Sequence, residues 1–319
     1  MTLTQLRAFI EVASTGSVRQ AATQLFVSQP AVSAAVAALQ RDLGIPLVAR
    51  EGRGLQLTPA GRIFAGYSRQ VLGLLEEGRL AAAGQLHPER GRVRLAAVTT
   101  AGEHVLPPFL AAFRKRCPEA EVTLEVGNRR RVWELLSYRE VDLVIGGRPP
   151  ASGPFTTLAT RPNLLVVVAP RVGPEGDGDR GPRRVEVGEL ESQVWLVREA
   201  GSGTRSTVEE LFEELGISPS TLTLGSNGAI RESVRAGLGL TLISRDAVAR
   251  ELSRGALEEW RCDGLPLERG WHVVGRAEEE LTPTARLFLA GLTTGVEVGG
   301  VTPFTSLTAG DGGSTAGAA

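Results

Sequence analysis

The sequence predicts an α+β protein of several domains: a helix-turn-helix with a wing, a long linker helix, and a two-lobed α/β domain. Three observations lead to this prediction. Two short helices with a polar face lie near the start, heptad-spaced apolar residues follow between 58 and 86, and strands alternate with helices from residue 92 onward. Alternation of this kind is typical of sheets covered by helices. The 319 residues also exceed what one small core usually holds.

The start of the chain predicts three helices. Apolar residues over 3–13 recur at helical spacing. Ser17 and Gln20 are spaced as in a capping box, which opens a second helix. Ser28 is the expected N-cap of a third helix, and Pro30 fits its first turn because the amides there have no helical acceptors. A helix, a short turn and a second helix with a polar, under-filled N-terminal face are typical of a helix-turn-helix.

The segment after the third helix predicts a wing and then a long helix. Apolar residues flank the glycine-rich run 51–54, so we expect a β-hairpin that presents Arg53 at its tip. Thr58 and Pro59 are the expected N-cap and first residue of a helix that reaches about Leu86.

The long helix carries a heptad repeat through which two copies of the chain could pair. The repeat consists of Phe64, Tyr67, Val71, Leu74, Gly78 and Ala81. Its small residues would permit close approach but offer little core of their own. Pairing is therefore the favoured interpretation, and the alternative is a helix that packs only on its own domain.

Beyond a linker near 87–91, strands and helices alternate. Strands are expected near 92–98, 121–126, 141–146, 163–169, 194–198, 221–225, 239–243 and 271–275. Helices are expected near 104–116, 130–139, 204–215, 227–236 and 281–293. This order predicts parallel sheets in two α/β lobes, with ligands bound outside the carboxyl ends of the strands.

The domain boundaries follow from these patterns. We expect a winged helix-turn-helix domain over residues 1–60, a linker and dimerisation helix over 61–90, and the α/β domain over 91–295. The second lobe of that domain is expected at about 162–267. Residues 296–319 are rich in Gly, Ser, Thr and Ala, which predicts a disordered tail.

The composition excludes several enzyme classes, and we expect no cofactor and no metal. Lys115 is the only lysine and follows no glycine-rich loop, so a phosphate-binding loop is absent. No G-x-S-x-G motif occurs, and neither the three histidines nor the pair Cys117 and Cys262 have metal-ligand spacing. The chain start lacks the apolar core of a secretory signal, and no apolar run reaches about 18 residues. A cytoplasmic protein that does not enter a membrane is therefore expected.

The residues of the predicted helix-turn-helix resemble the LysR-type transcription regulators. The resemblance lies in the runs Leu6-Arg7-Ala8-Phe9, Ala21-Ala22-Thr23-Gln24-Leu25, Ser28-Gln29-Pro30-Ala31-Val32-Ser33, Leu43-Gly44-Ile45-Pro46-Leu47 and Leu57-Thr58-Pro59-Ala60-Gly61. It covers residues 2–62 without a gap. The later strands and helices are similar to the two-lobed sensor of that family, which resembles periplasmic solute-binding proteins, so the whole resemblance covers about residues 1–295.

Within the family, residues 127–129 and 142–150 are similar to the subgroup that controls Calvin-cycle (RubisCO) carbon-fixation operons. The sequence departs from the family pattern at three places. Ala34 stands where a basic residue is frequent, Thr99-Thr100 where a serine is common, and Ser244 where proline is frequent.

Six residues are candidate DNA contacts: Ser28, Gln29, Pro30, Ser33, Arg50 and Arg53. The third helix is expected in the major groove, where Gln29 can bind adenine through two hydrogen bonds and Ser33 can bind a base or a phosphate. The resemblance implies the same positions together with Pro30. Arg53 could enter the minor groove and Arg50 contact a phosphate. The alternative for each polar residue is a solvated surface or a helix cap, and it applies first to the N-cap serine.

The charge balance limits how one copy can hold double-stranded DNA. Residues 1–62 contain six arginines and three acidic residues, a net charge of +3, within a chain of net charge −1. A local basic patch must therefore hold the DNA. Because one copy offers few phosphate contacts, we expect a dimer on an interrupted palindromic operator. The family implies a tetramer, and RNA polymerase is a further expected partner.

Three turns after predicted strands could converge on a cleft between the lobes. The candidate effector-binding residues are Thr99, Thr100, Asn128, Arg148, Gly201, Ser202, Gly203, Thr204 and Arg205. Helix N-termini favour anions, and arginine binds carboxylate or phosphate in bidentate geometry. We therefore expect an anionic metabolite, and the subgroup implies a phosphorylated sugar, a related organic phosphate or NADPH. The alternative is that the Ser and Thr residues only cap helices.

The leading interpretation is a sequence-specific DNA-binding transcription regulator that responds to a small molecule. A solute-binding protein without DNA function would explain residues 92–293 but would leave the helix-turn-helix unused. An α/β enzyme that uses the cleft would lack a nucleophile-base pair and a metal set.

Overall fold

The computed structural model describes residues 1–51, 54–171 and 181–307, which form two compact units. The first unit contains Met1–His87 and the short segment Leu135–Val141. The second contains Pro88–Glu134 and the chain from Asp142 onward. The predicted helix-turn-helix and linker helix thus lie in the first unit, and the α/β domain makes up most of the second.

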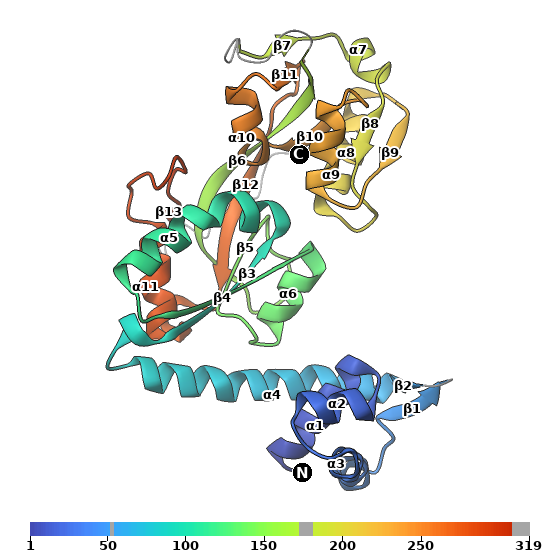
Figure 1. Cartoon of the computed structure of the whole chain (residues 1–319), viewed down its shortest axis with the longest axis vertical. Helices are drawn as coiled ribbons and strands as arrows, with labels where there is room; N and C mark the ends of the chain where they lie inside the picture. Colours follow the sequence, from blue (N-terminus) through green and yellow to red (C-terminus); the bar gives the residue numbers. More distant parts are fainter. Residues whose placement is uncertain (52–53, 172–180, 308–319) are drawn as a thin grey trace. The chain divides into compact units, whose positions relative to one another are not determined.

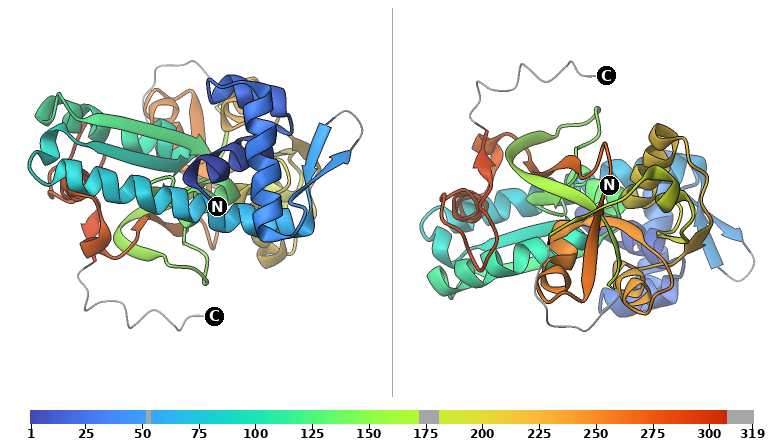
Figure 2. Two further views of the ribbon diagram at one scale, coloured as in Figure 1. Left: turned by 90° about the horizontal axis from the view of Figure 1, so that it is seen from below. Right: turned by 90° about the horizontal axis from the view of Figure 1, so that it is seen from above.

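The first unit is built from helices and a β-hairpin, which stands beside the helices (Figures 1 and 2). Its elements are α1 (Leu3–Thr15), α2 (Val18–Gln24), α3 (Gln29–Leu43), β1 (Val48–Glu51), β2 (Gly54–Leu57) and α4 (Pro59–Gly84). Ser17, Ser28 and Thr58 cap their helices, since each side chain accepts a backbone N–H three residues on. Gly16 and Gly44 end α1 and α3 with φ of 65° and 70°, a left-handed geometry that favours glycine.

One apolar core joins α1 to α4. Its most deeply buried members are Leu6, Phe9, Val12, Ala21, Val32, Val36, Leu39, Leu47 and Ala65. The rings of Phe9 and Phe64 lie 5.8 Å apart and so hold the start of α4 against α1. Because each fully buried large apolar side chain contributes roughly 1.5–3 kcal/mol, this cluster fixes the position of α3.

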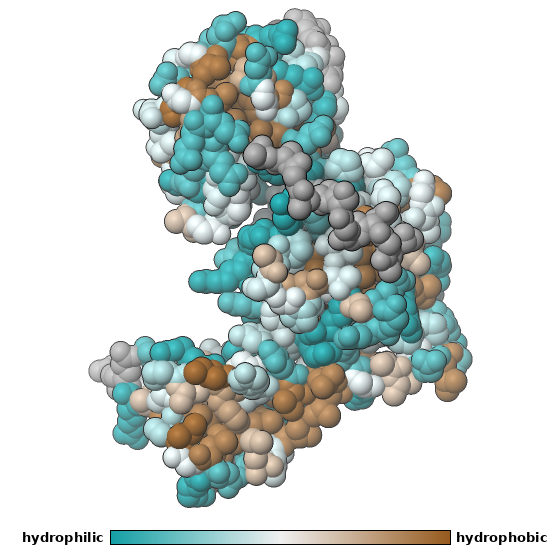
Figure 3. All heavy atoms as spheres, turned by 180° about the vertical axis from the view of Figure 1, so that it is seen from behind, coloured by the Kyte–Doolittle hydropathy of each residue, from teal (hydrophilic) through white to brown (hydrophobic). Residues whose placement is uncertain are grey.

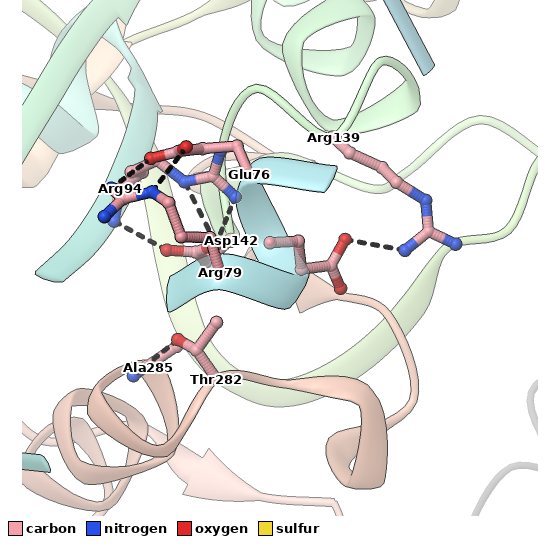
Figure 4. Close-up of polar contacts among 8 residues, drawn as sticks. Glu76, Arg79, Arg94, Arg139, Asp142, Thr282 and Ala285 are labelled. Carbon is pink, nitrogen blue, oxygen red and sulfur yellow. Dashed lines mark hydrogen bonds and ion pairs between the residues drawn. The ribbon is translucent and has the colours of Figure 1, made fainter. Parts of the chain in front are cut away.

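The segment Leu135–Val141 packs against the middle of α4 within the same unit. Gly73 permits this contact, since a side chain there would overlap the carbonyl oxygen of Tyr138. Nη1 of Arg139 donates to Oε2 of Glu77 at 2.6 Å, and the two side chains are 22% and 14% exposed (Figure 4). A partly shielded ion pair thus adds to the packing on α4.

Two long strands connect the lobes of the second unit. β6 (Thr156–Pro170) and β12 (Leu267–Gly275) lie side by side and pair antiparallel along nearly the whole length of β12 (Figure 1). We use the second-lobe bounds predicted from the sequence: lobe 2 is residues 162–267, and lobe 1 is the rest of this unit.

Lobe 1 contains parallel strands in the order β4-β3-β5, joined through β12 to β6. Its elements are η1 (Pro88–Arg90), β3 (Arg92–Val98), η2 (Ala101–Val105), α5 (Leu106–Arg116), β4 (Glu121–Gly127), the start of α6 (Arg129–Ser137), β5 (Leu143–Gly146), η3 (Glu278–Glu280), α11 (Pro283–Leu292) and β13 (Thr305–Ser306). Helices α5 and α11 share one core with the sheet, where Phe113 meets Phe288 edge-on at 5.2 Å.

Lobe 2 is built around the far half of β6. Its elements are β7 (Arg183–Arg184), α7 (Val187–Glu191), β8 (Trp195–Val197), α8 (Gly203–Leu215), β9 (Thr221–Thr223), α9 (Asn227–Arg235), β10 (Thr241–Ser244), α10 (Arg245–Ser253) and β11 (Leu257–Arg261). β10 and β11 pair antiparallel with β6, while β8 and β9 form a separate parallel pair. Buried clusters around Trp195 and around Val234 hold the helices of this lobe to the strands.

The sheets differ from the predicted all-parallel arrangement. The prediction is correct for β3, β4 and β5 and for β8 with β9, but β6 pairs antiparallel with β10, β11 and β12. β6 and β12 are antiparallel because the chain enters lobe 2 along β6 and returns to lobe 1 along β12. Only the apolar run 163–169 of β6 was expected, and the polar half that begins at Thr156 was not.

The chain beyond residue 295 also differs from the prediction of a disordered tail. Phe304 is 2% exposed and lies 6.0 Å from Phe109, and β13 pairs with β6 at Ala159 and Thr160. The aromatic side chain completes the core of lobe 1, and the strand covers an edge of β6. The remaining residues 308–319 lie outside the described part of the chain.

Candidate functional site

Ser28 begins the candidate DNA-contacting helix. Its Oγ accepts the Ala31 N–H at 3.4 Å, so the serine caps α3. A helix cap was the alternative to a DNA contact for this residue. Pro30 lies in the first turn, where its missing N–H costs no helical hydrogen bond. The cap therefore fixes where α3 begins and which side chains follow on its first turn.

The first turns of α3 divide into a buried and an exposed face. Val32 and Leu39 are 1% and 0% exposed and anchor the inner face. Gln29, Pro30 and Ser33 are exposed on the outer face. The helix therefore offers an amide, a pyrrolidine ring and a hydroxyl to a partner outside the protein, which is the chemistry needed to read base edges.

The wing is a hairpin in which Arg50 pairs in register with Leu55. Arg50 is exposed, and the N–H of Leu55 donates to the Gly16 carbonyl at 2.9 Å, which ties the hairpin to the end of α1. Arg53, which was predicted at the wing tip, lies outside the described residues. Ala34 is exposed beside Ser33 and presents only a methyl group.

In lobe 1, positive charge gathers where β4 and β5 end. Arg148 is exposed directly after β5, and Nη1 of Arg129 would lie 3.7 Å from a side chain placed at Gly147. His272 pairs in register with Gly146. Burial lowers the pKa of His272, and the charges of Arg148 and Arg129 lower it further. These observations define a cationic edge on lobe 1.

The remaining lobe 1 candidates have distinct roles. Asn128 caps α6, because its Oδ1 accepts the Arg131 N–H at 2.9 Å. Thr100 makes no capping bond; it is 9% exposed, and its hydroxyl accepts from Nδ2 of Asn227 at 2.9 Å. Thr99 precedes it, half-buried, at the end of β3. Capping thus accounts for Asn128 and not for Thr100, whose partner lies in lobe 2.

The lobe 2 candidates form the turn between β8 and α8. Gly201 has φ of 87°, which favours glycine, and Ser202 is 8% exposed without a capping bond from its side chain. Gly203 and Thr204 open α8. Arg205 is already engaged: its Nε donates to Glu209 Oε1 at 2.7 Å and its Nη1 to the Arg198 carbonyl at 3.2 Å.

The structure brings two residues to this turn that the sequence reasoning missed. Arg198, at 9% exposure, follows β8, and Asn227, at 5%, is the first residue of α9. Nη1 of Arg198 donates to Oδ1 of Asn227 at 2.7 Å. An arginine directly after a buried strand was a usable signal, whereas Asn227 is found only from its contacts.

The described residues contain neither a metal-ligand cluster nor a single helix that could span a membrane. No group of three or more His, Cys, Asp or Glu there is arranged to hold a metal ion. In the same part of the chain, no single helix has both the length and the apolarity to cross a membrane; only α2 and α3 together meet both conditions, as a pair bent by 109°.

Two stretches of the chain match known protein families. Residues 3–62 match the bacterial regulatory helix-turn-helix proteins of the lysR family, and residues 87–296 match the LysR substrate binding domain. The chain belongs to the LysR family. It is therefore a DNA-binding transcription regulator with an effector-binding domain and not an enzyme. The resemblance found in the sequence is confirmed.

Relatives within the LysR family include regulators of carbon-fixation operons. The HTH-type transcriptional regulator CbbR of Xanthobacter flavus is 37% identical over 290 residues, covering 90% of this chain and 86% of the relative. The RuBisCO operon transcriptional regulator of Allochromatium vinosum is 34% identical over 289 residues, covering 90% and 94%. The transcriptional activator CmpR of Synechocystis sp. is 32% identical over 289 residues, covering 90% and 93%.

Solved structures of LysR-family proteins share the fold. A full-length OxyR variant of Pseudomonas aeruginosa superposes with a TM-score of 0.72 at 21% identity, covering 97% of this chain and 99% of OxyR. CbnR, a LysR family transcriptional regulator, gives 0.65 at 23% identity, covering 91% and 98%. The CcmR regulatory domain of Synechocystis, solved in complex with 2-PG, gives 0.55 at 31% identity, covering 62% and 93%.

Proposed function

We propose that this LysR-family regulator controls a carbon-fixation operon in response to an anionic metabolite. The observation that carries the operon assignment is the extent of similarity to CbbR of Xanthobacter flavus, 37% identity over 90% of the chain, which spans both domains. A regulator that binds chromosomal DNA acts in the cytoplasm. The activity of the proposed regulator resides in α3 and the wing, in the exposed face of α4, and in the two-lobed domain.

The proposed DNA contacts are the exposed residues of α3 together with Arg50. Gln29 reads an adenine edge, Ser33 a base or a phosphate, and Pro30 an apolar base surface. Arg50 on the hairpin binds a phosphate and so sets the position of the domain without reading sequence. CbnR has been solved with its target DNA, so a relative of the same fold binds DNA specifically.

The exposed face of α4 supports an oligomer. Large apolar side chains project from this helix (Figure 3): Ile63, Tyr67, Val71, Leu74 and Leu75 are 66%, 65%, 46%, 53% and 49% exposed. A contiguous apolar face of this kind marks an interaction surface. The occupant that fits is α4 of a second copy, because Tyr67, Val71 and Leu74 of this face follow the heptad spacing. Two joined copies place two α3 helices on a two-fold symmetric operator, and pairs of dimers form the tetramer.

The cationic edge of lobe 1 supports an anionic effector. Arg129 and Arg148 lie there near His272, and two buried polar groups, Thr100 after β3 and Ser202 before α8, belong to the candidate turns. Arginine pairs bind phosphate or carboxylate by charge-assisted hydrogen bonds. A phosphorylated sugar, a related organic phosphate or NADPH fits this chemistry. A bound effector changes the balance between lobe arrangements, which alters contacts with DNA and RNA polymerase.

Genomic DNA captured by the full-length protein tests the operon assignment. Sequencing of the captured fragments should return a promoter beside carbon-fixation genes, containing an interrupted palindrome. Gln29→Ala should weaken binding to that promoter roughly tenfold or more, because a bidentate base contact contributes about 1–3 kcal/mol of discrimination. Gln85→Ala, at the exposed C-terminal end of α4, should leave binding unchanged. Equal, weak capture of all genomic fragments would reject the proposal.

Sedimentation of the purified protein tests the oligomer. Leu74→Glu places a charge on the apolar face of α4 and should shift the dimer or tetramer toward monomer. Ile45→Glu is the matched control, since Ile45 is 42% exposed between α3 and β1. A wild-type monomer at micromolar concentration, or an unchanged mass for Leu74→Glu, would contradict pairing through α4.

Calorimetric titration with a metabolite panel tests the effector class. The panel should contain phosphorylated sugars, organic phosphates, NADPH, and neutral and cationic compounds of similar size. Arg148→Ala should abolish or strongly weaken binding of the active anion, whereas Arg254→Ala, at the exposed end of α10, should not. Binding confined to neutral or cationic compounds would reject an anionic effector.

A further inference from the structure

The side chain of Arg198 is a buried cation beside the effector turn of lobe 2. It is 10% exposed, and its hydrogen bonds run in two directions. Nε and Nη2 donate to the two carboxylate oxygens of Glu199 at 2.7 and 2.8 Å, while Nη1 donates to Oδ1 of Asn227 at 2.7 Å. A buried guanidinium needs an anion, because an unpaired charge in a shielded site is costly. In this structure Glu199 supplies that anion.

Glu199 is the exposed member of this pair. Its side chain is 43% exposed, in contrast to that of Arg198. Hydrogen bonds from Arg198 lower the pKa of the Glu199 carboxyl, so the group is an anion at neutral pH. The planar fork of arginine donates to carboxylate or phosphate oxygens with the same geometry. A second anion of either kind could therefore take the place of the Glu199 carboxylate.

Asn227 links the guanidinium to lobe 1. Its Oδ1 accepts from Arg198, and its Nδ2 donates to the Thr100 hydroxyl at 2.9 Å. The oxygen and the nitrogen of this buried side-chain amide are therefore both hydrogen-bonded, which fixes the orientation of the side chain. A change in the position of Arg198 consequently removes a partner of Asn227 and disturbs its bond to Thr100, which lies directly after β3.

The space beside these residues is closed in this structure. Arg198, Thr204 and Asn227 line a hollow together with apolar residues of β8, α8 and β10, and it does not admit a sphere of the size of water. A ligand can enter the hollow only if a lining side chain, such as that of Arg198, moves. Glu199 does not line the hollow, but it is the exposed partner of Arg198, and its carboxylate can leave the guanidinium at low cost because it can be solvated outside.

We infer that Glu199 is an internal substitute for the effector anion, which an incoming phosphate or carboxylate displaces from Arg198. In this mechanism Glu199 lowers effector affinity, because the effector must break its two charge-assisted hydrogen bonds before it gains its own. Displacement releases Glu199 to solvent and moves Arg198 toward the effector. Asn227 then transmits the change to Thr100 and so to lobe 1. The inference rests on the proposed anionic effector and adds Arg198, Glu199 and Asn227 to its site.

The decisive variant is Glu199→Gln, which keeps the size of the side chain but removes its charge. The full-length protein is titrated calorimetrically with inorganic phosphate and with 2-PG as probes. Because a hydrogen bond to a charged partner is stronger than one between neutral groups, Glu199→Gln should bind at least one probe about tenfold more tightly than the wild type. A gain in affinity cannot arise from misfolding, so it reports directly on competition.

A charge-matched control separates competition from general electrostatics. Glu232→Gln removes a carboxylate from the same lobe, where it forms an exposed ion pair with Arg235 at 2.8 Å. That variant should bind the probes as the wild type does. Arg198→Gln should lose binding in both the wild-type and the Glu199→Gln backgrounds while retaining the tryptophan fluorescence of the folded domain.

The outcomes distinguish the two proposals. Tighter binding by Glu199→Gln alone, including binding that is measurable only in that variant, supports displacement. If the wild type binds a probe and Glu199→Gln binds it equally or more weakly, displacement is wrong and the anionic effector stands. Equal gains for Glu199→Gln and Glu232→Gln also overturn displacement. If neither the wild type nor any variant binds any anion of the panel, the effector proposal fails and displacement fails with it.

Discussion

Gly61, on the first turn of α4, lies against the backbone of Leu47. A side chain at Gly61 would overlap the carbonyl oxygen of Leu47 and lie 2.8 Å from its carbonyl carbon. That carbonyl cannot easily retreat, because it accepts the Thr58 N–H at 3.0 Å and Leu47 is fully buried. The missing side chain therefore lets the linker helix begin directly beneath the wing.

Gly61→Ala should destabilise the winged helix-turn-helix by about 3 kcal/mol, since backbone must move to admit the methyl group. Hydrogen exchange would detect the change as faster exchange of the amides in α1, α3 and α4. Gly66→Ala is the matched control on the same helix, because its side chain would meet only the ring of Tyr138 at 3.7 Å, an ordinary contact. Equal protection in the two variants would contradict the close approach at Gly61.

Phe26, in the turn between α2 and α3, combines a left-handed backbone with an exposed ring. Its φ is 56° and the residue is 94% exposed. A left-handed conformation costs an ordinary residue roughly 1–2 kcal/mol, and asparagine tolerates it better. Phe26→Asn should therefore raise the stability of the first unit by about 1 kcal/mol, whereas the β-branched Phe26→Val should lower it. Thermal unfolding followed by circular dichroism checks the order Asn, Phe, Val; the reverse order would contradict it.

Local chemistry explains why much of the fold could be predicted from the sequence. The caps at Ser17, Ser28 and Thr58 bond to backbone only three residues away, so they mark helix starts without help from tertiary contacts. The runs that became β3 and β8 are short and apolar and ended close to the expected positions. By contrast, α10 and β11 went unpredicted, and the polar half of β6 becomes a strand only because β12, over 90 residues later, pairs with it.

The candidate site divides in the same way. Gln29, Pro30 and Ser33 were predictable because a capped helix fixes which side chains face outward. The link from Arg198 through Asn227 to Thr100 was not, since Asn227 is 29 residues from one partner and 127 from the other. The Arg205 pair with Glu209 is different: it spans four residues on α8, so its spacing was visible in the sequence. The link through Asn227, by contrast, depends on tertiary structure and leaves no periodic pattern.

Arg94 and Asp142 form a buried ion pair that joins β3 to the start of β5 (Figure 4). Their side chains are 9% and 3% exposed. One carboxylate oxygen of Asp142 accepts Nη2 of Arg94 at 2.7 Å, and the other accepts the Arg94 backbone N–H at 2.7 Å. Removal of the Asp142 charge would break a charge-assisted pair in a shielded site.

Asp142→Asn should destabilise the two-lobed domain by about 3–5 kcal/mol, the usual effect of breaking a buried pair. Urea unfolding followed by tryptophan fluorescence measures this domain, because all four tryptophans lie beyond residue 130. Glu125→Gln is the control: it breaks the Arg131 pair, whose side chains are 46% and 45% exposed, and should cost less than about 1 kcal/mol. Similar losses in both variants would show that burial of the Arg94 pair is unimportant.

His104 and His272 should make the two-lobed domain sensitive to acid. Burial is the main cause that lowers the pKa of each, with the charge of Arg231 acting on His104 and those of Arg148 and Arg129 on His272. A folded-state pKa below the ordinary value of 6.5 means that the folded domain binds fewer protons than the unfolded chain. Stability should therefore begin to fall as the pH drops below about 6.5 and level off once the pH is below the lowered values.

Replacement of both histidines tests this pH dependence, since glutamine keeps a polar side chain and does not titrate. The urea midpoint of the wild type, followed by tryptophan fluorescence, should decrease between pH 7.5 and pH 5.5. The double variant His104→Gln, His272→Gln should show a smaller decrease. Each single variant should show an intermediate decrease, because different arginines lower the pKa values of the two histidines. A decrease of the same size in the wild type and the double variant would assign the acid sensitivity to other groups.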